Sequence, residues 1–154
     1  MFEKLTDQAK QVMELANREA QYWSREVVGV DHLFLALCRS ETGLAAKILR
    51  QLGLDLKQTR LEMGKMMKSG QGETMGGELP LGEEVEKTFE HATKHARKLG
   101  HPYIGTEHLL LGLFSQRALL PGRFLTSRGI TRAKVKKELA ISIAAERASV
   151  VRGG

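Results

Sequence analysis

The fold is decided by one stretch that the chain contains twice, Gly29-Val30-Asp31-His32-Leu33-Phe34-Leu35-Ala36-Leu37 and Gly105-Thr106-Glu107-His108-Leu109-Leu110-Leu111-Gly112-Leu113. The copies lie 76 residues apart. The same offset relates Ala16 and Ala20 to Ala92 and Ala96, and Gly53-Leu54 to Gly129-Ile130. An offset that holds without a gap over such a length indicates a duplicated unit, because chance similarity would not keep one register.

Each copy carries the pattern of four helices. In the first helix apolar residues recur at helical spacing, and the second helix, from Asp31 or Glu107, is apolar nearly all round. The third helices end at Gly53 and Gly129, and the later one is expected to start after Pro121. No segment alternates as a strand would. We therefore predict an all-α fold of eight helices, in which two tandem four-helix repeats are related by approximate two-fold symmetry.

The repeats are expected to form one domain over residues 1–150. The first repeat covers about 2–68 and the second about 83–145. Five glycines and one proline fall within residues 69–82, a composition typical of a linker that is flexible or drapes over the surface. Residues 146–154 are expected to be a flexible C-terminal end.

Composition and charge exclude several classes of protein. Apolar residues make up 42% and charged residues 27%, which argues against disorder. A single cysteine, Cys38, excludes an internal disulfide framework and a multi-cysteine zinc site, and its apolar surroundings predict an inert buried thiol. The net charge of +6 is concentrated between residues 123 and 152, which hold eight basic and two acidic residues. No apolar run is long enough to cross a bilayer and no secretory signal is visible, so we expect a cytoplasmic protein without a membrane partner.

The candidate binding residues lie at the start of the two apolar helices. Gly105 allows a tight turn, Thr106 is a predicted N-cap, and Glu107 falls in the first helical turn. Free N–H groups at a helix start can hold an anion, and an adjacent carboxylate can hold a cation. In the first copy Val30 cannot cap, so capping could shift to Asp31 and occupy its carboxylate.

These motifs resemble the repeat signature of the N-terminal domain of Clp-type protein-unfolding ATPases, especially the ClpC/ClpA group. In that family a Gly-Thr-Glu-His motif followed by an apolar helix occurs twice. The opening residues Met1 to Lys10 and the stretch Gly43 to Leu49 are also similar to the family. The resemblance covers about residues 1–140 and identifies the chain as an isolated Clp N-domain or a stand-alone protein of that fold.

The resemblance implies a non-catalytic module that docks protein substrates, adaptors or degradation tags on an AAA+ unfoldase ring. In Gram-positive relatives the domain also reads phosphoarginine, where the acid of each motif holds the guanidinium and the helix start helps to hold the phosphate. The matching residues here are Asp31, Thr106 and Glu107. The plainer interpretation is that Thr106 is only a cap and that the two acids only stabilise their own helices.

Other functions have less support in the residues. No P-loop, nucleophile elbow or metal-ligand spacing is present, so we expect no enzyme, no cofactor and no metal. One alternative is an accessory protein that binds and regulates a Clp ATPase ring in trans. A more remote alternative is nucleic-acid binding through the basic end, which lacks an aromatic stacking platform. Tyr22 and Trp23 are expected to pack over the adjoining loop, with an exposed docking aromatic as the other possibility. His32 and His108 recur at matched positions, which predicts a shared packing or hydrogen-bonding role.

Overall fold

The computed structural model describes residues 2–67, 70 and 76–153. A 3-10 turn at Phe2–Lys4 precedes α1 (Asp7–Tyr22), α2 (Val30–Arg39), α3 (Leu44–Gln51), α4 (Leu56–Met66), α5 (Glu83–Lys98), α6 (Thr106–Leu113), α7 (Leu120–Ser127) and α8 (Arg132–Gly153). Over these residues the structure contains eight α-helices and no named strand. The predicted all-α fold is confirmed.

Local sequence signals account for most of the helix boundaries. The side chains of Thr6 and Asp55 accept hydrogen bonds from the first turns of α1 and α4, as N-caps do. Gly53, Gly100 and Gly129 have φ of +93°, +73° and +72°, a left-handed conformation that stops a helix at little cost only when the residue is glycine. Of these signals the stop at Gly53 recurs as the same residue, Gly129, at the repeat-related position. Gly82 stands where the first repeat has Thr6, and Ser24, with φ of +54°, stands where the second repeat has Gly100.

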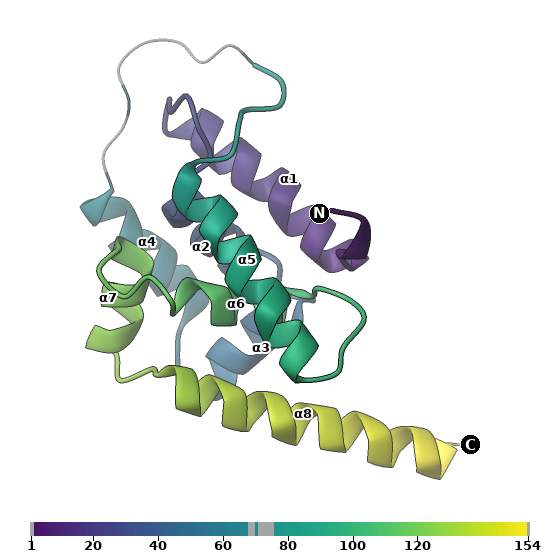
Figure 1. Cartoon of the computed structure of the whole chain (residues 1–154). Helices are drawn as coiled ribbons and strands as arrows, with labels where there is room; N and C mark the ends of the chain where they lie inside the picture. The colour runs from purple at the N-terminus through teal and green to yellow at the C-terminus, as the bar shows by residue number, and fades with distance from the viewer. Residues whose placement is uncertain (1, 68–69, 71–75, 154) are drawn as a thin grey trace.

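The core is built around α2 and α6. Every residue from His32 to Cys38 and from Thr106 to Leu113 is buried, so both helices are covered on all sides. In Figure 1 they lie at the centre, with α1 and α5 across one side and α8 running along the bottom. α1 packs on α2 and α5 packs on α6, while α2 and α6 contact each other. Phe34 and Phe124, whose ring centroids are 6.2 Å apart, join the first repeat to the second.

Four backbone hydrogen bonds show the two-fold relation between the repeats. The segment before α1 pairs with the loop before α6: Thr6 N–H donates to the Ile104 carbonyl (3.0 Å) and Ile104 N–H to the Lys4 carbonyl (2.8 Å). The segment before α5 pairs with the loop before α2: Gly82 N–H donates to the Val28 carbonyl (2.8 Å) and Val28 N–H to the Pro80 carbonyl (2.9 Å). Each pair maps onto the other through the 76-residue offset. The leading segment of each repeat therefore pairs with the other repeat.

The structure differs from the sequence analysis at two helix ends. α7 begins at Leu120, so Pro121 lies inside its first turn, where its missing N–H costs no intrahelical bond. α8 continues as a helix to Gly153, whereas residues 146–154 were expected to form a flexible end. No glycine or proline interrupts residues 132–152, and alanine and arginine in the last turns favour a helix. Figure 1 shows this end of α8 reaching past the other helices.

The predicted linker is only partly described, since residues 69 and 71–75 lie outside the described part of the chain. Its second half lies against α1. The Gly77 carbonyl accepts from the side-chain amides of Asn17 (2.9 Å) and Gln21 (2.7 Å), and Leu79 N–H donates to Asn17 Oδ1 (2.8 Å). This half of the segment drapes over the surface of the first repeat.

Candidate functional site

The three predicted binding residues lie at the starts of the two central helices. Glycine is the N-cap of both helices, Gly29 for α2 and Gly105 for α6. Thr106 is therefore the first residue of α6 and not its N-cap, and capping has not shifted to Asp31. The predictions that Thr106 caps its own helix and that Asp31 could be occupied as a cap were both wrong. No hydrogen bond or ion pair in the described part of the chain joins Asp31 to Thr106 or Glu107.

The missing side-chain cap is replaced by a histidine in each repeat. Gly29 N–H donates to Nδ1 of His32 and Gly105 N–H donates to Nδ1 of His108, both at 2.8 Å. Because Nδ1 accepts, the proton of the neutral ring is on Nε2, and in His108 this atom lies 2.9 Å from His101 Nδ1. Burial is the main reason that the pKa of His32 and of His108 is lowered to about 4. The predicted shared hydrogen-bonding role of these histidines is confirmed.

The Thr106 hydroxyl serves the other repeat. Its Oγ1 accepts a 3.0 Å hydrogen bond from the N–H of Ala45, in the first turn of α3, and Thr106 is only 2% exposed. The approach is close enough that a Cβ on Gly43 would lie 3.0 Å from the same oxygen. At the related positions the chain has Val30, without an acceptor, and Pro121, without an N–H. Both halves of this hydrogen bond are therefore absent from the related pair.

Glu107 is a buried acid without a cation. Its side chain is folded back so closely that Oε1 takes the place where a Cβ on Gly105 would stand, and the residue is 6% exposed. Burial raises the pKa of Glu107, its own backbone N–H lowers it, and the nearby Glu146 raises it. Within residues 2–67, 70 and 76–153 no basic side chain makes an ion pair with it. The carboxylate is thus held in a position that costs stability when it is ionised.

Asp31 occupies the same helical position but a more open one. Asp31 is half-buried. Its carboxylate does not fold back onto Gly29 as that of Glu107 folds back onto Gly105, because the aspartate side chain is one methylene shorter. Burial raises the pKa of Asp31, and the charge of Arg25 acts in the opposite direction. The acid of the first repeat is therefore the more accessible of the two.

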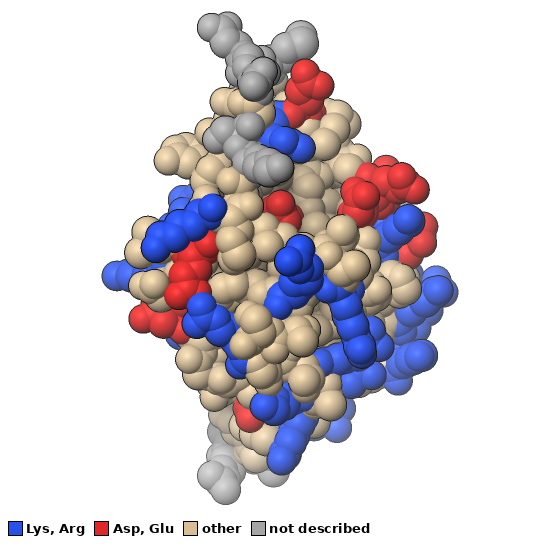
Figure 2. Space-filling model, turned by 90° about the vertical axis from the view of Figure 1, so that its left-hand side faces the viewer, with Lys and Arg blue, Asp and Glu red and all other residues tan. Residues whose placement is uncertain are grey.

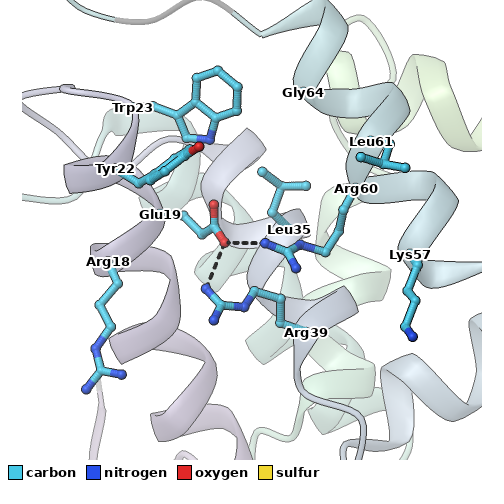
Figure 3. Close-up of a pocket in the computed structure, with 10 residues that line it drawn as sticks. All are labelled: Arg18, Glu19, Tyr22, Trp23, Leu35, Arg39, Lys57, Arg60, Leu61 and Gly64. Carbon is cyan, nitrogen blue, oxygen red and sulfur yellow. Dashed lines mark hydrogen bonds and ion pairs between the residues drawn. The ribbon is translucent and has the colours of Figure 1, made fainter.

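A cluster of charges that was not predicted from the sequence lies between α1, α2 and α4. Glu19 is almost fully buried and its Oε1 lies 2.9 Å from Arg39 Nη1 and 3.3 Å from Arg60 Nη2. Figure 3 shows both guanidinium groups converging on this carboxylate at the base of a pocket. A signal was present, since Glu19 falls among Ala9, Val12, Ala16 and Ala20 on the apolar face of its helix. An acid at such a position requires partners from neighbouring elements.

Two aromatic residues at the end of α1 lie beside this cluster. Tyr22 is 79% exposed, and its ring meets that of Trp23 edge-on at 5.6 Å. A Cβ on Gly64 of α4 would lie 3.6 Å from the indole, so Trp23 packs against α4. Tyr22 is too exposed to be packed over the adjoining loop, so for this residue the alternative of an exposed aromatic fits the structure.

The described residues contain no cluster of metal-ligating side chains, and the one cysteine is buried. Cys38 is 2% exposed and burial raises the pKa of its thiol to about 12, so it is not a nucleophile at neutral pH. No group of three histidine, cysteine, aspartate or glutamate side chains converges within this part of the chain. Nor does any described helix combine the length and apolar character needed to span a bilayer.

Comparison with known proteins agrees with this geometry. The family model "Clp repeat (R) N-terminal domain" matches residues 4–128. A probable ATP-dependent Clp protease ATP-binding subunit from Chlamydia pneumoniae is 38% identical over 139 residues, which are 90% of this chain and 16% of that protein. Eight of the curated relatives that it matches are much longer, and the chain spans 14–17% of their length.

Solved structures share the fold at lower identity. The N-terminal domain of the chaperone ClpD from Arabidopsis thaliana has a TM-score of 0.69 and 21% identity, with 91% of this chain and 97% of that one covered. A ClpV N-domain in complex with a VipB peptide has a TM-score of 0.73 and 18% identity, with 89% and 85% covered. At these identities the likeness concerns the fold alone.

Proposed function

The chain belongs to the Clp repeat N-terminal domain family, and from this premise we propose that it is a non-catalytic docking module that binds protein substrates, adaptors or degradation tags for an AAA+ unfoldase. The observation that carries the proposal is that a ClpV N-domain of the same fold forms a complex with a VipB peptide. The buried Cys38 thiol and the absence of a P-loop from the sequence support a role without catalysis. The unfoldase ring would either be part of the same polypeptide or be bound as a separate protein, and the module would act in the cytoplasm.

Docking accelerates unfolding by raising the local concentration of a substrate near the ring. A tethered site of weak affinity is enough, because the second encounter becomes intramolecular. The backbone pairing between the repeats supports such a role, since it joins both repeats into one body on which a partner can dock.

The finer proposal is that phosphoarginine tags bind at the starts of α2 and α6. The carboxylates of Asp31 and Glu107 would pair with the guanidinium, and free N–H groups of the first turn would hold the phosphate. The raised pKa of Glu107 supports this, because a bound cation would offset the cost of its burial. Glu107 must first turn away from Gly105. Thr106 then acts by keeping the starts of α6 and α3 together, since its oxygen already accepts from Ala45.

Docking is tested by grafting the chain onto a ClpC-type ring from which the native N-domain has been removed. We expect the graft to restore degradation of a substrate that depends on the N-domain. A ring that remains as inactive as the truncated one with every substrate tried would refute the docking function.

The tag site is tested separately by calorimetric titration with free phosphoarginine. Heat is expected with the wild-type chain, less heat with Asp31→Ala or Glu107→Ala, and none when arginine or inorganic phosphate is titrated alone. Equal affinity in all three proteins, or no heat with the wild type, would reject the tag site and leave the docking function standing.

A further inference from the structure

A pocket of about 690 Å³ opens between α1 and α4, with α2 at its base. We call it the α1–α4 pocket. Figure 3 shows Arg18 on one side, Lys57 on the other, and the Glu19 cluster between them. Its volume is within the usual range for ligand sites and would accept two or three side chains of a peptide. None of the three predicted binding residues lines it.

The charge of this pocket is positive. Four basic side chains line it, those of Arg18, Arg39, Lys57 and Arg60, and Glu19 is the one acid among its lining residues. Glu19 is already neutralised by two of the arginines, whose side chains remain 38% and 45% exposed. Spare guanidinium N–H groups therefore face the opening together with Arg18 and Lys57. The basic lining therefore favours an anionic ligand. Figure 2 shows further basic side chains gathered over the lower part of one face of the molecule, with acidic groups at its upper right and left.

The same pocket has apolar walls. Tyr22 is 79% exposed and Leu61 is 64% exposed, unusual values for side chains of this size on adjacent helices. The indole N–H of Trp23 is buried and has no hydrogen-bond partner among the described residues. In Figure 3 Tyr22 stands between this nitrogen and the Glu19 cluster. A ligand carboxylate or carbonyl that displaced the tyrosine ring would give the donor an acceptor.

The repeat-related pocket provides an internal comparison. It lies between α5 and α8 and is also basic, but the 76-residue offset places His95 at the position of Glu19 and Lys136 at that of Arg60. Lys98 and Leu99 replace the aromatic pair. Of the two pockets, only the α1–α4 pocket therefore combines aromatic side chains with a fixed pair of arginines.

We propose that the α1–α4 pocket docks an acidic peptide segment in which an aspartate or glutamate lies next to a bulky apolar side chain. The inference rests on the proposed docking function and names the class of partner. The carboxylate would meet Arg18, Lys57 and the exposed edges of the two arginines, and the apolar side chain would lie between Tyr22 and Leu61. A nucleic acid fits less well, since Tyr22 is the one strongly exposed aromatic ring among the lining residues, and stacking of successive bases uses more than one.

The single tryptophan of the chain makes the pocket directly observable, because Trp23 forms part of its wall. The probe is a tryptophan-free twelve-residue peptide that alternates Asp-Glu pairs with Leu-Phe pairs. We expect a saturable change in Trp23 emission that weakens as salt is raised. Lys57→Glu should weaken binding about tenfold, as for a rim contact of opposite charge, and Leu61→Ser should weaken it several-fold. The matched control is Lys136→Glu in the repeat-related pocket, with an expected change below about twofold.

Three results would overturn the proposal. The first is no emission change at millimolar peptide. The second is equal weakening by Lys57→Glu and Lys136→Glu, which would reveal a response to net charge only. The third is tighter binding of a single-stranded oligonucleotide of the same charge than of the peptide.

The grafted ring separates failure of the pocket from failure of docking. If the ring degrades other substrates but handles one carrying the acidic peptide equally well with and without Lys57→Glu, the pocket proposal is wrong and docking stands. If the peptide binds Trp23 as expected but the ring degrades nothing, the pocket stands as a binding site and the docking function fails.

Discussion

Replacing Thr106 with valine tests the hydrogen bond that joins the two repeats. The substitution keeps the shape of the side chain and removes the acceptor of the Ala45 N–H, which is buried at the start of α3. Loss of a helix cap costs about 1 kcal/mol, and a buried donor left without a partner costs about 1–3 kcal/mol. We therefore expect Thr106→Val to lower the free energy of unfolding by about 1–3 kcal/mol, or Tm by about 2–4 °C for each kcal/mol.

The assay is urea denaturation, in which the midpoint should fall while the m-value stays the same. A double-mutant cycle with Ala45→Pro isolates the bond, because proline removes the donor at a position where α7 already carries Pro121. The double variant reproduces the Val30 and Pro121 arrangement of the related pair, so its loss should be clearly smaller than the sum of the two single losses. Additive losses, or a Thr106→Val protein within about 0.3 kcal/mol of wild type, would refute the assigned role.

Three further substitutions or conditions test the buried charges. Because the pKa of Glu107 is raised, the folded state binds its proton more tightly than the unfolded state does. The free energy of unfolding therefore falls as pH rises from 4.5 to the pKa of the folded state. Urea titrations should show Glu107→Gln to be more stable than wild type at pH 7.5, and the difference should disappear near pH 4. The lowered pKa of about 4 at His32 and His108 means that the unfolded state binds more protons than the folded state below pH 6.5. Each histidine should therefore lower the free energy of unfolding by about 1–2 kcal/mol between pH 7.5 and pH 5. An unchanged urea midpoint over this range would contradict the prediction. Glu19→Gln should lower the free energy of unfolding by no more than about 1 kcal/mol, since both arginine partners are more than a third exposed and regain water. A loss of several kcal/mol in the same urea assay would show that the two ion pairs behave as buried ones.

Local signals in the sequence were enough to predict the helices. The caps at Thr6 and Asp55 and the left-handed stops at Gly53 and Gly129 act within a few residues, so the sequence alone reveals them. The duplication then predicted the architecture, because any boundary found in one copy was expected in the other. The end of α8 is harder to predict, because the helix continues to Gly153 for lack of a glycine or proline in residues 132–152 and not through any residue that marks a boundary.

The site residues depended on contacts that no local signal contains. Thr106 looks like an N-cap in the sequence, and only the position of α3 shows that its oxygen serves Ala45. Glu19 is recognisable as an acid on an apolar face, but its arginine partners come from two other helices. The difference between Asp31 and Glu107 rests on one methylene, which allows only the longer side chain to fold back on its glycine.

The reciprocal pairing of Leu5 with Ile104 and of Val28 with Leu81 has a consequence for how the duplication is held together. If the chain were cut within residues 69–75, the leading segment of each half would lose its backbone partner. The loop that pairs with the other half's leading segment would also be left without one. Mixed in solution, the two halves are expected to reassemble. One half alone should form a dimer in which two copies exchange their leading segments. On this view the chain is the covalently joined counterpart of a two-chain assembly of single repeats.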